Sequence, residues 1–334
     1  MASSAAALKG AFWIALPTVT SALAYGTYKF DPNLVDAAKS FFTGPGSYSR
    51  IIALGVIRVW HGLISSIYLP HHKHTPDKLF HPVISESHVT LLEVDYNIHK
   101  SNSTYFADLD VSRTHLVGYL LARGLHGIAH NAKTKLVMDP SDPAKPAKGK
   151  LGIMLGAVEC SFKREIKPYA KFEMWSRVLA WDRKWMYIVT HFVEKGTVKP
   201  RSWDDGGRHG PTRKNDSAPQ DWEKKIYATA ISKYVFKIGR LTVHPAVIIG
   251  ASGLLPERPG GWVTTTENGA AKPTEPVTGG ALDDEAESST TWDWRRTEEE
   301  LNKGLQYAQQ FASLDGMHGL FDGGEDGALG KFGL

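Results

Sequence analysis

The chain has 334 residues, of which 42% are hydrophobic and 22% are charged, so it is long enough to bury a sizeable core. Its formal net charge of +4 is small for this length, and basic residues are scattered among acidic ones, which argues against nucleic-acid binding. The single cysteine, Cys160, excludes an internal disulfide framework and a cysteine-based zinc site. Because Cys160 lies in an apolar segment, we expect a buried structural thiol rather than a nucleophile.

Residues 1–30 are predicted to form a membrane anchor or a targeting segment. They contain no acidic residue, and no charge lies between Lys9 and Lys29. The apolar stretch is only marginally long enough to span a bilayer, which takes about 20 residues. A cleaved secretory signal, a mitochondrial presequence and a buried helix remain alternatives to an uncleaved anchor.

Residues 31–86 are predicted to be a helical and loop extension. An apolar helix is expected over residues 49–69, but Arg58 within it disfavours a second membrane span. An interfacial helix and a helix packed on the sheet are the two interpretations. The following linker, residues 70–88, contains five histidines and three prolines; we expect a polar loop there and no metal site.

Chemically reactive side chains gather where the sequence changes from a strand pattern to a helix pattern. An apolar run from Val89 to Val94 predicts a strand that leads directly into Asp95 and His99, and a helical period follows from Tyr105. A carboxylate at a strand end can act as a base or a nucleophile. The free N–H groups of the next helix's first turn can stabilise a developing negative charge.

Further strands are expected after this helix. They are predicted over residues 151–166, 171–180, 185–193 and 226–249, separated by exposed loop insertions near 138–150 and 196–222. Composition predicts a disordered linker over residues 256–295. A capping box at Thr297–Glu300 then starts an amphipathic helix within the tail, residues 296–334, with Leu301 and Leu305 on its apolar face.

The central stretch resembles a known family. Its pattern, D-x-x-x-H-x-N-N-x-x-Y followed by an arginine, is matched by Asp95, His99, Asn102, Tyr105 and Arg113. The pattern is similar to that of hotdog-fold acyl-thioesterases of the 4-hydroxybenzoyl-CoA thioesterase type. It resembles in particular membrane-associated proteins similar to thioesterase superfamily member six and their fungal relatives. A second block, Ser161–Phe192, is similar to the family's next strands.

The resemblance implies an α+β hotdog fold over residues 87–255, in which a curved antiparallel sheet wraps around a helix that starts near Asn102. It also implies a homodimer that hydrolyses acyl-CoA or acyl-carrier-protein thioesters without a cofactor. The relatives favour association with a membrane, at the endoplasmic reticulum, with the mitochondrion as an alternative. The competing interpretation is a non-catalytic acyl-binding or scaffold protein.

Site roles follow from the same resemblance. Asp95 is expected to be the nucleophile or general base, His99 to orient it, and the N–H at Asn102 to point at the carbonyl oxygen. Tyr105 and Ser101 are expected to bind substrate, although Ser101 is also a natural helix cap. Asp95 as a mere loop brace is the alternative.

Three positions depart from the pattern. Ile98 stands where the family usually has glycine, Lys100 where a small apolar residue is common, and Ser101 where the first asparagine is expected. These changes favour the non-catalytic interpretation. Asp108 and Asp110 are expected on a solvated face of the helix, with Asp110–Arg113 as a surface pair.

Overall fold

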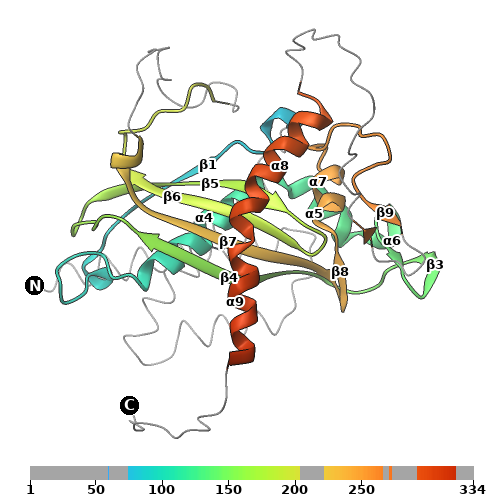
Figure 1. The fold of residues 1–334 in the computed structure, drawn as a ribbon, viewed down its shortest axis with the longest axis horizontal. Helices are drawn as coiled ribbons and strands as arrows, with labels where there is room; N and C mark the ends of the chain where they lie inside the picture. The colour runs from blue at the N-terminus through green and yellow to red at the C-terminus, as the bar shows by residue number, and fades with distance from the viewer. Residues whose placement is uncertain (1–58, 60–73, 204–221, 266–270, 273–291, 321–334) are drawn as a thin grey trace, which may run out of the picture. The chain divides into compact units, whose positions relative to one another are not determined.

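A computed structural model describes residues 59, 74–203, 222–265, 271–272 and 292–320 of the chain. In this part of the chain, one antiparallel sheet curves around a long helix (Figure 1). The strands of this sheet are β1 (Val83–His88), β4 (Leu151–Phe162), β5 (Lys171–Trp181), β6 (Trp185–Glu194), β7 (Ile226–Ile238) and β8 (Leu241–Val243). The helices are α4 (Thr104–Leu120), α5 (Ala122–Ala129), α6 (Asn131–Thr134), α7 (Pro245–Ala251), α8 (Trp294–Ala308) and α9 (Gln310–Gly316).

Short elements connect these. The 3-10 turns are η1 (Pro76–Lys78), η2 (Leu91–Glu93), η3 (Trp222–Lys225) and η4 (Met317–Leu320). Two small hairpin sheets pair β2 (Met138–Asp139) with β3 (Asp142–Pro146), and β9 (Thr264–Thr265) with β10 (Ala271–Lys272).

The main sheet has the strand order β1-β5-β6-β7-β4, and β8 pairs with the end of β7. All of these pairings are antiparallel. Side chains along β6 alternate between the two faces of the sheet: Met186 and Ile188 belong to the core beneath α4, whereas Tyr187 and Val189 belong to a core on the opposite face. Both faces of the sheet are therefore covered.

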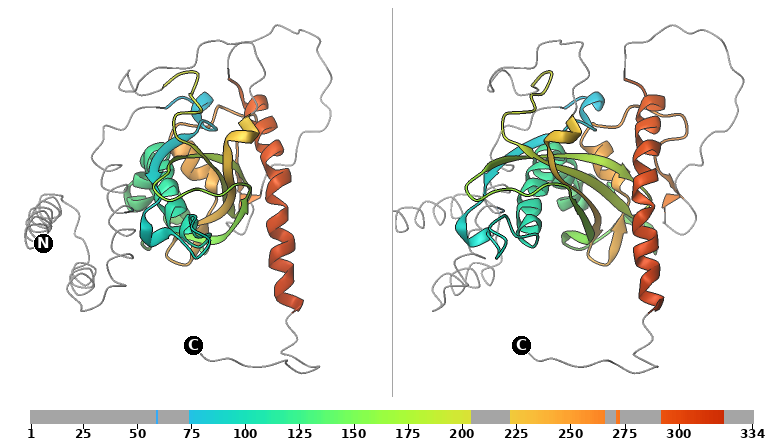
Figure 2. Two further views of the ribbon diagram at one scale, coloured as in Figure 1. Left: turned by 90° about the vertical axis from the view of Figure 1, so that its left-hand side faces the viewer. Right: turned by 60° about the vertical axis from the view of Figure 1, so that its left-hand side comes forward.

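Helix α4 lies in the concave side of the sheet, as Figure 2 shows. Its N-terminal half packs through Leu109 against Phe172 and Phe192, and its C-terminal half packs through Leu116 in a second cluster that contains Phe236. This arrangement confirms the predicted α+β hotdog architecture, in which a curved antiparallel sheet wraps around a central helix.

A row of three buried hydroxyl groups separates the two apolar clusters. Ser112 on α4 lies 2.7 Å (Oγ to Oγ) from Ser176 on β5, and Ser176 lies 2.6 Å from Oγ1 of Thr190 on β6. All three residues are buried, so each hydroxyl meets a partner in place of water. This hydroxyl row connects the middle of the helix to the middle of the sheet.

The C-terminal helices α8 and α9 lie on the other face of the sheet, opposite α4 (Figure 2). Leu305, Ala308 and Phe311 pack there against the outward side chains of β5 and β6. The absence of a side chain at Gly304 permits the close approach, because a Cβ atom there would lie 2.0 Å from the carbonyl oxygen of Leu179. The predicted amphipathic helix thus completes the outer core.

The start of α8 differs from the prediction. The capping box at Thr297–Glu300 was expected to begin the helix, but α8 begins at Trp294, and the Asp293 side chain accepts the N–H of Arg296 as the cap. Thr297 lies inside the first turn, where its buried hydroxyl accepts a hydrogen bond from the Trp292 indole. The cap that forms is therefore Asp293, one turn before Thr297.

The prediction of a strand over Val89–Val94 is also wrong. The strand β1 ends at His88, inside the segment expected to be a polar loop, and residues 91–93 form the turn η2. The Glu93 carboxylate accepts the N–H of Thr90 and so closes this turn, while Leu91 and Leu92 are exposed. The sheet therefore begins at Val83, four residues before the predicted domain boundary of 87.

Two segments expected to be irregular contain ordered residues. Within the loop predicted near 138–150, β2 and β3 form a hairpin, and the Asn131 amide donates to the carbonyl oxygens of Val137 and Ala147. Within the linker predicted as disordered over 256–295, Trp262 and Trp292 pack against the core at either end. In the second segment, the aromatic side chains contribute apolar area that the overall composition conceals.

The predicted anchor (residues 1–30), most of the 31–86 extension and the central part of the 196–222 insertion lie outside the described residues. Among the helices that the structure does describe, none combines the length and the apolar character needed to cross a bilayer.

Candidate functional site

The Asp95 loop, defined as residues 93–101, is a narrow reversal of the chain held by its own backbone. The N–H of Asp95 donates to the His99 carbonyl over 3.0 Å, and the N–H of Ser101 donates to the Glu93 carbonyl over 2.7 Å. Val94 and Lys100 form an antiparallel bridge between the two sides. The tip contains Ile98 with a φ of 61°, a left-handed conformation that is unusual for a β-branched residue.

Asp95 is part of a turn and also retains an accessible carboxylate. Its Oδ1 atom accepts the N–H of Asn97 over 2.9 Å, which is the pattern of an Asx turn. The side chain is 21% exposed. The bracing role considered in the sequence is therefore real, and it leaves part of the carboxylate open to water.

His99 lies beside Asp95, and its orienting role stays a prediction of the resemblance. Its Nδ1 atom is 3.6 Å from Asp95 Oδ1 and 3.3 Å from the carbonyl oxygen of Lys100. The tautomer with a proton on Nδ1 donates to that carbonyl and leaves Nε2 as the acceptor. In the protonated ring, the same nitrogen stabilises the carboxylate electrostatically.

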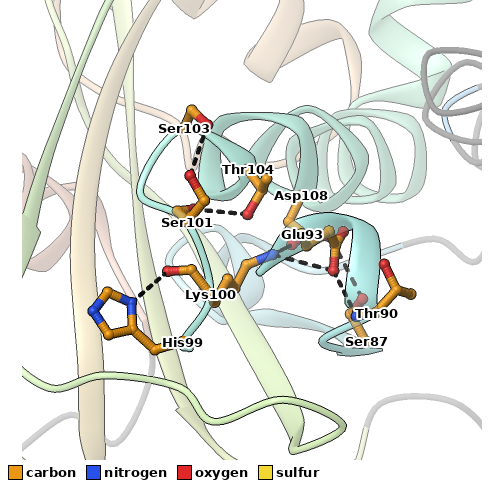
Figure 3. A network of polar contacts seen from close by, with 9 residues as sticks. All are labelled: Ser87, Thr90, Glu93, His99, Lys100, Ser101, Ser103, Thr104 and Asp108. Carbon is orange, nitrogen blue, oxygen red and sulfur yellow. Dashed lines mark hydrogen bonds and ion pairs between the residues drawn. The ribbon is translucent and has the colours of Figure 1, made fainter. Parts of the chain in front are cut away.

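The N-terminus of α4 follows the loop directly (Figure 3). Asn102 is exposed in the turn that precedes the helix, and the cap position is Ser103 rather than Ser101. Ser101 does not cap with its side chain: its hydroxyl lies 3.0 Å from the Ser103 hydroxyl, and its carbonyl oxygen accepts the N–H of Thr104. The predicted capping role of Ser101 is therefore corrected to a backbone contact, because the helix starts at Thr104.

Tyr105 points into the core. It is buried between Phe162 and Phe192, with ring centroids 5.0 and 4.9 Å away. Burial raises the pKa of its phenol above the ordinary value. This packing accounts for an aromatic residue at this position, and its substrate-binding role stays a prediction, as does that of Ser101.

Beneath the loop, a buried cation lies among acidic and aromatic groups. The Lys100 ammonium is 2.8 Å from Asp108 Oδ2 and 3.5 Å from Glu93 Oε2, and its side chain has no exposed surface (Figure 3). It also lies 5.3 Å from the centroid of the Tyr105 ring and 5.4 Å from that of Phe172. The expectation that Asp108 lies on a solvated face is therefore wrong.

The sequence contained a signal for this buried pair. Asp108 lies three residues after Tyr105 and four before Ser112, so it shares the inward face of α4 with buried residues. A charge on that face needs a partner of opposite sign, and Lys100 was the unusual residue nearby. Interpreting Lys100 only as a departure from a family pattern concealed the connection.

Comparison with known proteins identifies the family. The model of the thioesterase-like superfamily matches residues 89–216. The probable thioesterase atnL of Emericella nidulans is 34% identical over 304 residues, which cover 87% of this chain and 91% of that protein. The chain belongs to the thioesterase-like superfamily. Thioesterase poxG of Penicillium oxalicum is 36% identical over 257 residues, 77% of this chain and 75% of that protein.

Solved structures that this chain is similar to are more distant in sequence. The probable thioesterase YbaW from Escherichia coli has 9% sequence identity and a TM-score of 0.31, covering 51% of this chain and 96% of that one. A probable thioesterase from Bartonella henselae likewise has 9% identity and a TM-score of 0.31, covering 49% and 98%.

Several large apolar side chains are exposed close to Asp95 in the chain. Tyr96 and Ile98, at the tip of the Asp95 loop, are 92% and 72% exposed, and Leu91 and Leu92 are exposed in the preceding turn.

Neither a metal ligand set nor a nucleophilic thiol is found in the described residues. Among residues 74–203, 222–265 and 292–320, no three His, Cys, Asp or Glu side chains are grouped as metal ligands would be. Of the linker histidines, His74 packs against the ring of Tyr119, with centroids 4.8 Å apart. Burial raises the pKa of the half-buried Cys160 thiol to about 11, which disfavours the thiolate.

Proposed function

We propose that this protein hydrolyses acyl thioesters, taking acyl-CoA or an acyl-carrier protein as substrate, with Asp95 as the catalytic carboxylate. The observation that carries this proposal is the partly exposed Asp95 carboxylate, which is held in a loop that leads directly into the N-terminus of α4. Membership of the thioesterase-like superfamily supports the reaction class.

The chemistry requires a base or nucleophile and an anion-stabilising group. As a base, the Asp95 carboxylate takes a proton from water, whose oxygen attacks the thioester carbonyl carbon. As a nucleophile, it attacks that carbon itself, and water then hydrolyses the mixed anhydride. Either route breaks the C–S bond and yields a carboxylic acid and a thiol. The N–H of Asn102, in the turn before α4, and N–H groups of the helix's first turn stabilise the oxyanion.

The test is a free-thiol release assay on the full chain with short, aromatic and long acyl-CoAs. Asp95→Asn is informative because an asparagine side chain can still accept the Asn97 N–H and so preserve the Asx turn while the charge is lost. We expect turnover to be lost and the melting temperature to stay unchanged. Asp139→Asn is the matched control, since Asp139 accepts the Ser141 N–H in a similar turn outside the site.

The second candidate function is acyl binding without turnover, and the Asx turn of Asp95 favours it because a turn needs no catalysis. Turnover in Asp95→Asn equal to that of the wild type would contradict a catalytic Asp95. Saturable acyl-CoA binding with no turnover in the wild type would establish the non-catalytic alternative.

We extend the proposal to a homodimer formed along β4. This strand is an edge of the main sheet, paired with β7 on one side, and Met154 and Leu155 are exposed on it. A second copy that pairs antiparallel along this edge would bury them and satisfy a two-fold axis. Sedimentation of Leu155→Glu should show monomers, whereas Tyr307→Glu on α8, which is exposed elsewhere, should leave the dimer unchanged.

Membrane association is a further part of the proposal, with the endoplasmic reticulum favoured over the mitochondrion. Its support is the apolar stretch without charges between Lys9 and Lys29, together with the resemblance to membrane-associated relatives. Membrane fractionation of the full chain and of a chain lacking residues 1–30 tests it, because only the full chain should pellet with membranes.

A further inference from the structure

We propose that Lys100 is a positioning residue for Asp95, acting through its buried ion pair with Asp108. This inference rests on the proposed function, because it concerns how the catalytic carboxylate is held. Lys100 lies across the bridge from Val94, next to His99, in the loop whose outer side carries Asp95. The two neighbours point in different directions: His99 toward Asp95, and Lys100 into the core.

The Lys100 ammonium connects three elements of the fold. Asp108 lies on α4, one turn beyond its start, and Glu93 lies in η2 and also accepts the N–H of Thr90 over 3.0 Å. Ser87, on β1, donates its hydroxyl to the other Asp108 oxygen over 3.4 Å. The cation therefore fixes the Asp95 loop against the helix, and Asp108 in turn contacts β1 at the edge of the sheet (Figure 3).

The backbone of the same residue adds a further contact. The N–H of Lys100 donates to the Ile166 carbonyl over 2.9 Å, beyond the end of β4. With the backbone held in this way and the side chain held by Asp108, the loop has few ways to shift relative to α4. That relationship matters because the carboxylate comes from the loop while the anion-stabilising N–H groups come from the helix.

A buried ion pair is a poor source of stability. The cost of removing both charges from water is comparable to the attraction between them, so replacing both by apolar residues of similar volume is often neutral or stabilising. Lys100 and Asp108 are both almost fully buried. We infer that the contribution of this pair is geometric, since it fixes the loop at a defined distance from the helix.

The decisive experiment compares single and double replacements in the full chain. Lys100→Met leaves the buried Asp108 carboxylate without its cation, and Asp108→Leu leaves the buried ammonium with only the more distant Glu93 carboxylate, so both should lower the melting temperature. The double variant removes both charges of the pair and should regain most of the lost melting temperature. We expect its kcat for thioester hydrolysis to remain roughly 10- to 100-fold below wild type, because small displacements of reacting groups have effects of this size, while KM changes little.

Lys233 and Asp315 supply the matched control. Lys233 is also buried, lies 2.7 Å from an Asp315 oxygen, and is close to the Trp185 and Phe311 rings, but it joins the sheet to α9 instead of to the Asp95 loop. The double variant Lys233→Met, Asp315→Leu should keep the wild-type kcat. Glu93→Gln is the milder variant, since it keeps an acceptor for Thr90; we expect a several-fold lower kcat at an unchanged melting temperature.

Amide hydrogen exchange provides a readout that does not depend on turnover. The N–H groups of Asp95, Ile98 and Ser101 are hydrogen-bonded within the loop and should exchange faster in the Lys100/Asp108 double variant than in the control. If the Lys100/Asp108 double variant keeps the wild-type kcat, the positioning role is wrong but the proposed function stands. If its loop amides exchange as slowly as those of the control, the ion pair does not hold the Asp95 loop. A wild-type chain without turnover overturns the proposed function itself, and the positioning role with it.

Discussion

The guanidinium of Arg113 donates from Nη1 to the hydroxyl of Ser232 over 2.6 Å, which joins the middle of α4 to β7. Its second contact is Asp110, whose side chain is 57% exposed, and the guanidinium also lies 5.5 Å from the centroid of the Tyr234 ring. The pair predicted for the helix surface is therefore a surface carboxylate bound to a buried arginine. The long side chain of Arg113 extends from the helix to β7, so that its guanidinium lies between the helix and the sheet.

Replacing Arg113 by methionine should lower the free energy of unfolding by about 1–3 kcal/mol, because the buried Ser232 hydroxyl loses its donor. Denaturant unfolding measures this change. Asp110→Asn should cost less than about 1 kcal/mol, since its side chain is largely in water. Adding Ser232→Ala to Arg113→Met should recover part of the loss, and no recovery would show that the hydroxyl is not the cause.

Gly304→Ala should destabilise the attachment of α8 to the sheet. At an ordinary helix position this change is favourable by about 1 kcal/mol. Here the new Cβ would meet the Leu179 carbonyl oxygen at 2.0 Å, so the helix must move away, at a cost of about 1–3 kcal/mol. Thermal unfolding and proteolysis of α8 report the effect. Gly316→Ala is the control, because its Cβ would have no neighbour within 4 Å.

Ile98→Gly should stabilise the protein. A left-handed conformation costs a residue with a Cβ about 1–2 kcal/mol, whereas glycine adopts it freely and loses roughly 0.5–1 kcal/mol through chain entropy. The net gain is about 0.5–1 kcal/mol, and thioester turnover should stay within about twofold of wild type. Tyr96→Gly, at a neighbouring exposed position without a positive φ, should be destabilising; a loss at both positions would argue against strain at Ile98.

His244 should make the stability depend on pH. Burial lowers the pKa of its imidazole to about 4, with Asp182 opposing and Arg183 reinforcing the effect, from an ordinary value of 6.5. As the pH falls below 6.5, His244 becomes protonated in the unfolded chain, whereas in the native chain it stays neutral until about pH 4. The contribution of His244 to the free energy of unfolding is therefore fully present above pH 6.5, and it falls by about 3 kcal/mol as the pH decreases to 4.

His244→Asn tests this assignment by unfolding experiments across pH 4–7. The Nδ1 atom of His244 accepts the Ala246 N–H at the start of α7, and an asparagine side chain can cap the helix in the same way. The variant should show a flatter pH dependence with little change at pH 7. An undiminished slope would assign the dependence to other groups.

The hotdog fold was predicted from the family resemblance, and the long strands from their regular alternation. The expected strands at 171–180 and 185–193 correspond to β5 and β6, and the turn between them begins at Asp182, after Trp181 ends β5. Short-range signals were less reliable. Leu91 and Leu92 read as strand residues, but the hydrogen bond from Thr90 to Glu93 makes a turn there, and that bond depends on geometry that composition does not carry.

The candidate site could be predicted only in part, and the predicted part consists of residues that are close together in the chain. Asp95 and His99 stand four residues apart in the chain, and a tight loop brings them together. The Lys100–Asp108 pair spans a loop and a helix turn, so its formation depends on the angle at which the helix enters. The contact between Arg113 and Ser232 joins residues 119 positions apart and requires the completed sheet.

The row of hydroxyls formed by Ser112, Ser176 and Thr190 fixes the position of α4 along its own axis relative to the sheet. Apolar contacts have no preferred direction, so a core made only of them tolerates sliding of the helix along the sheet. A slide of one turn, about 5.4 Å, would separate these hydroxyls and leave them buried without partners, at about 1–3 kcal/mol each. Mutations in either apolar cluster can therefore reshape the interior while the first turn of α4 keeps its place.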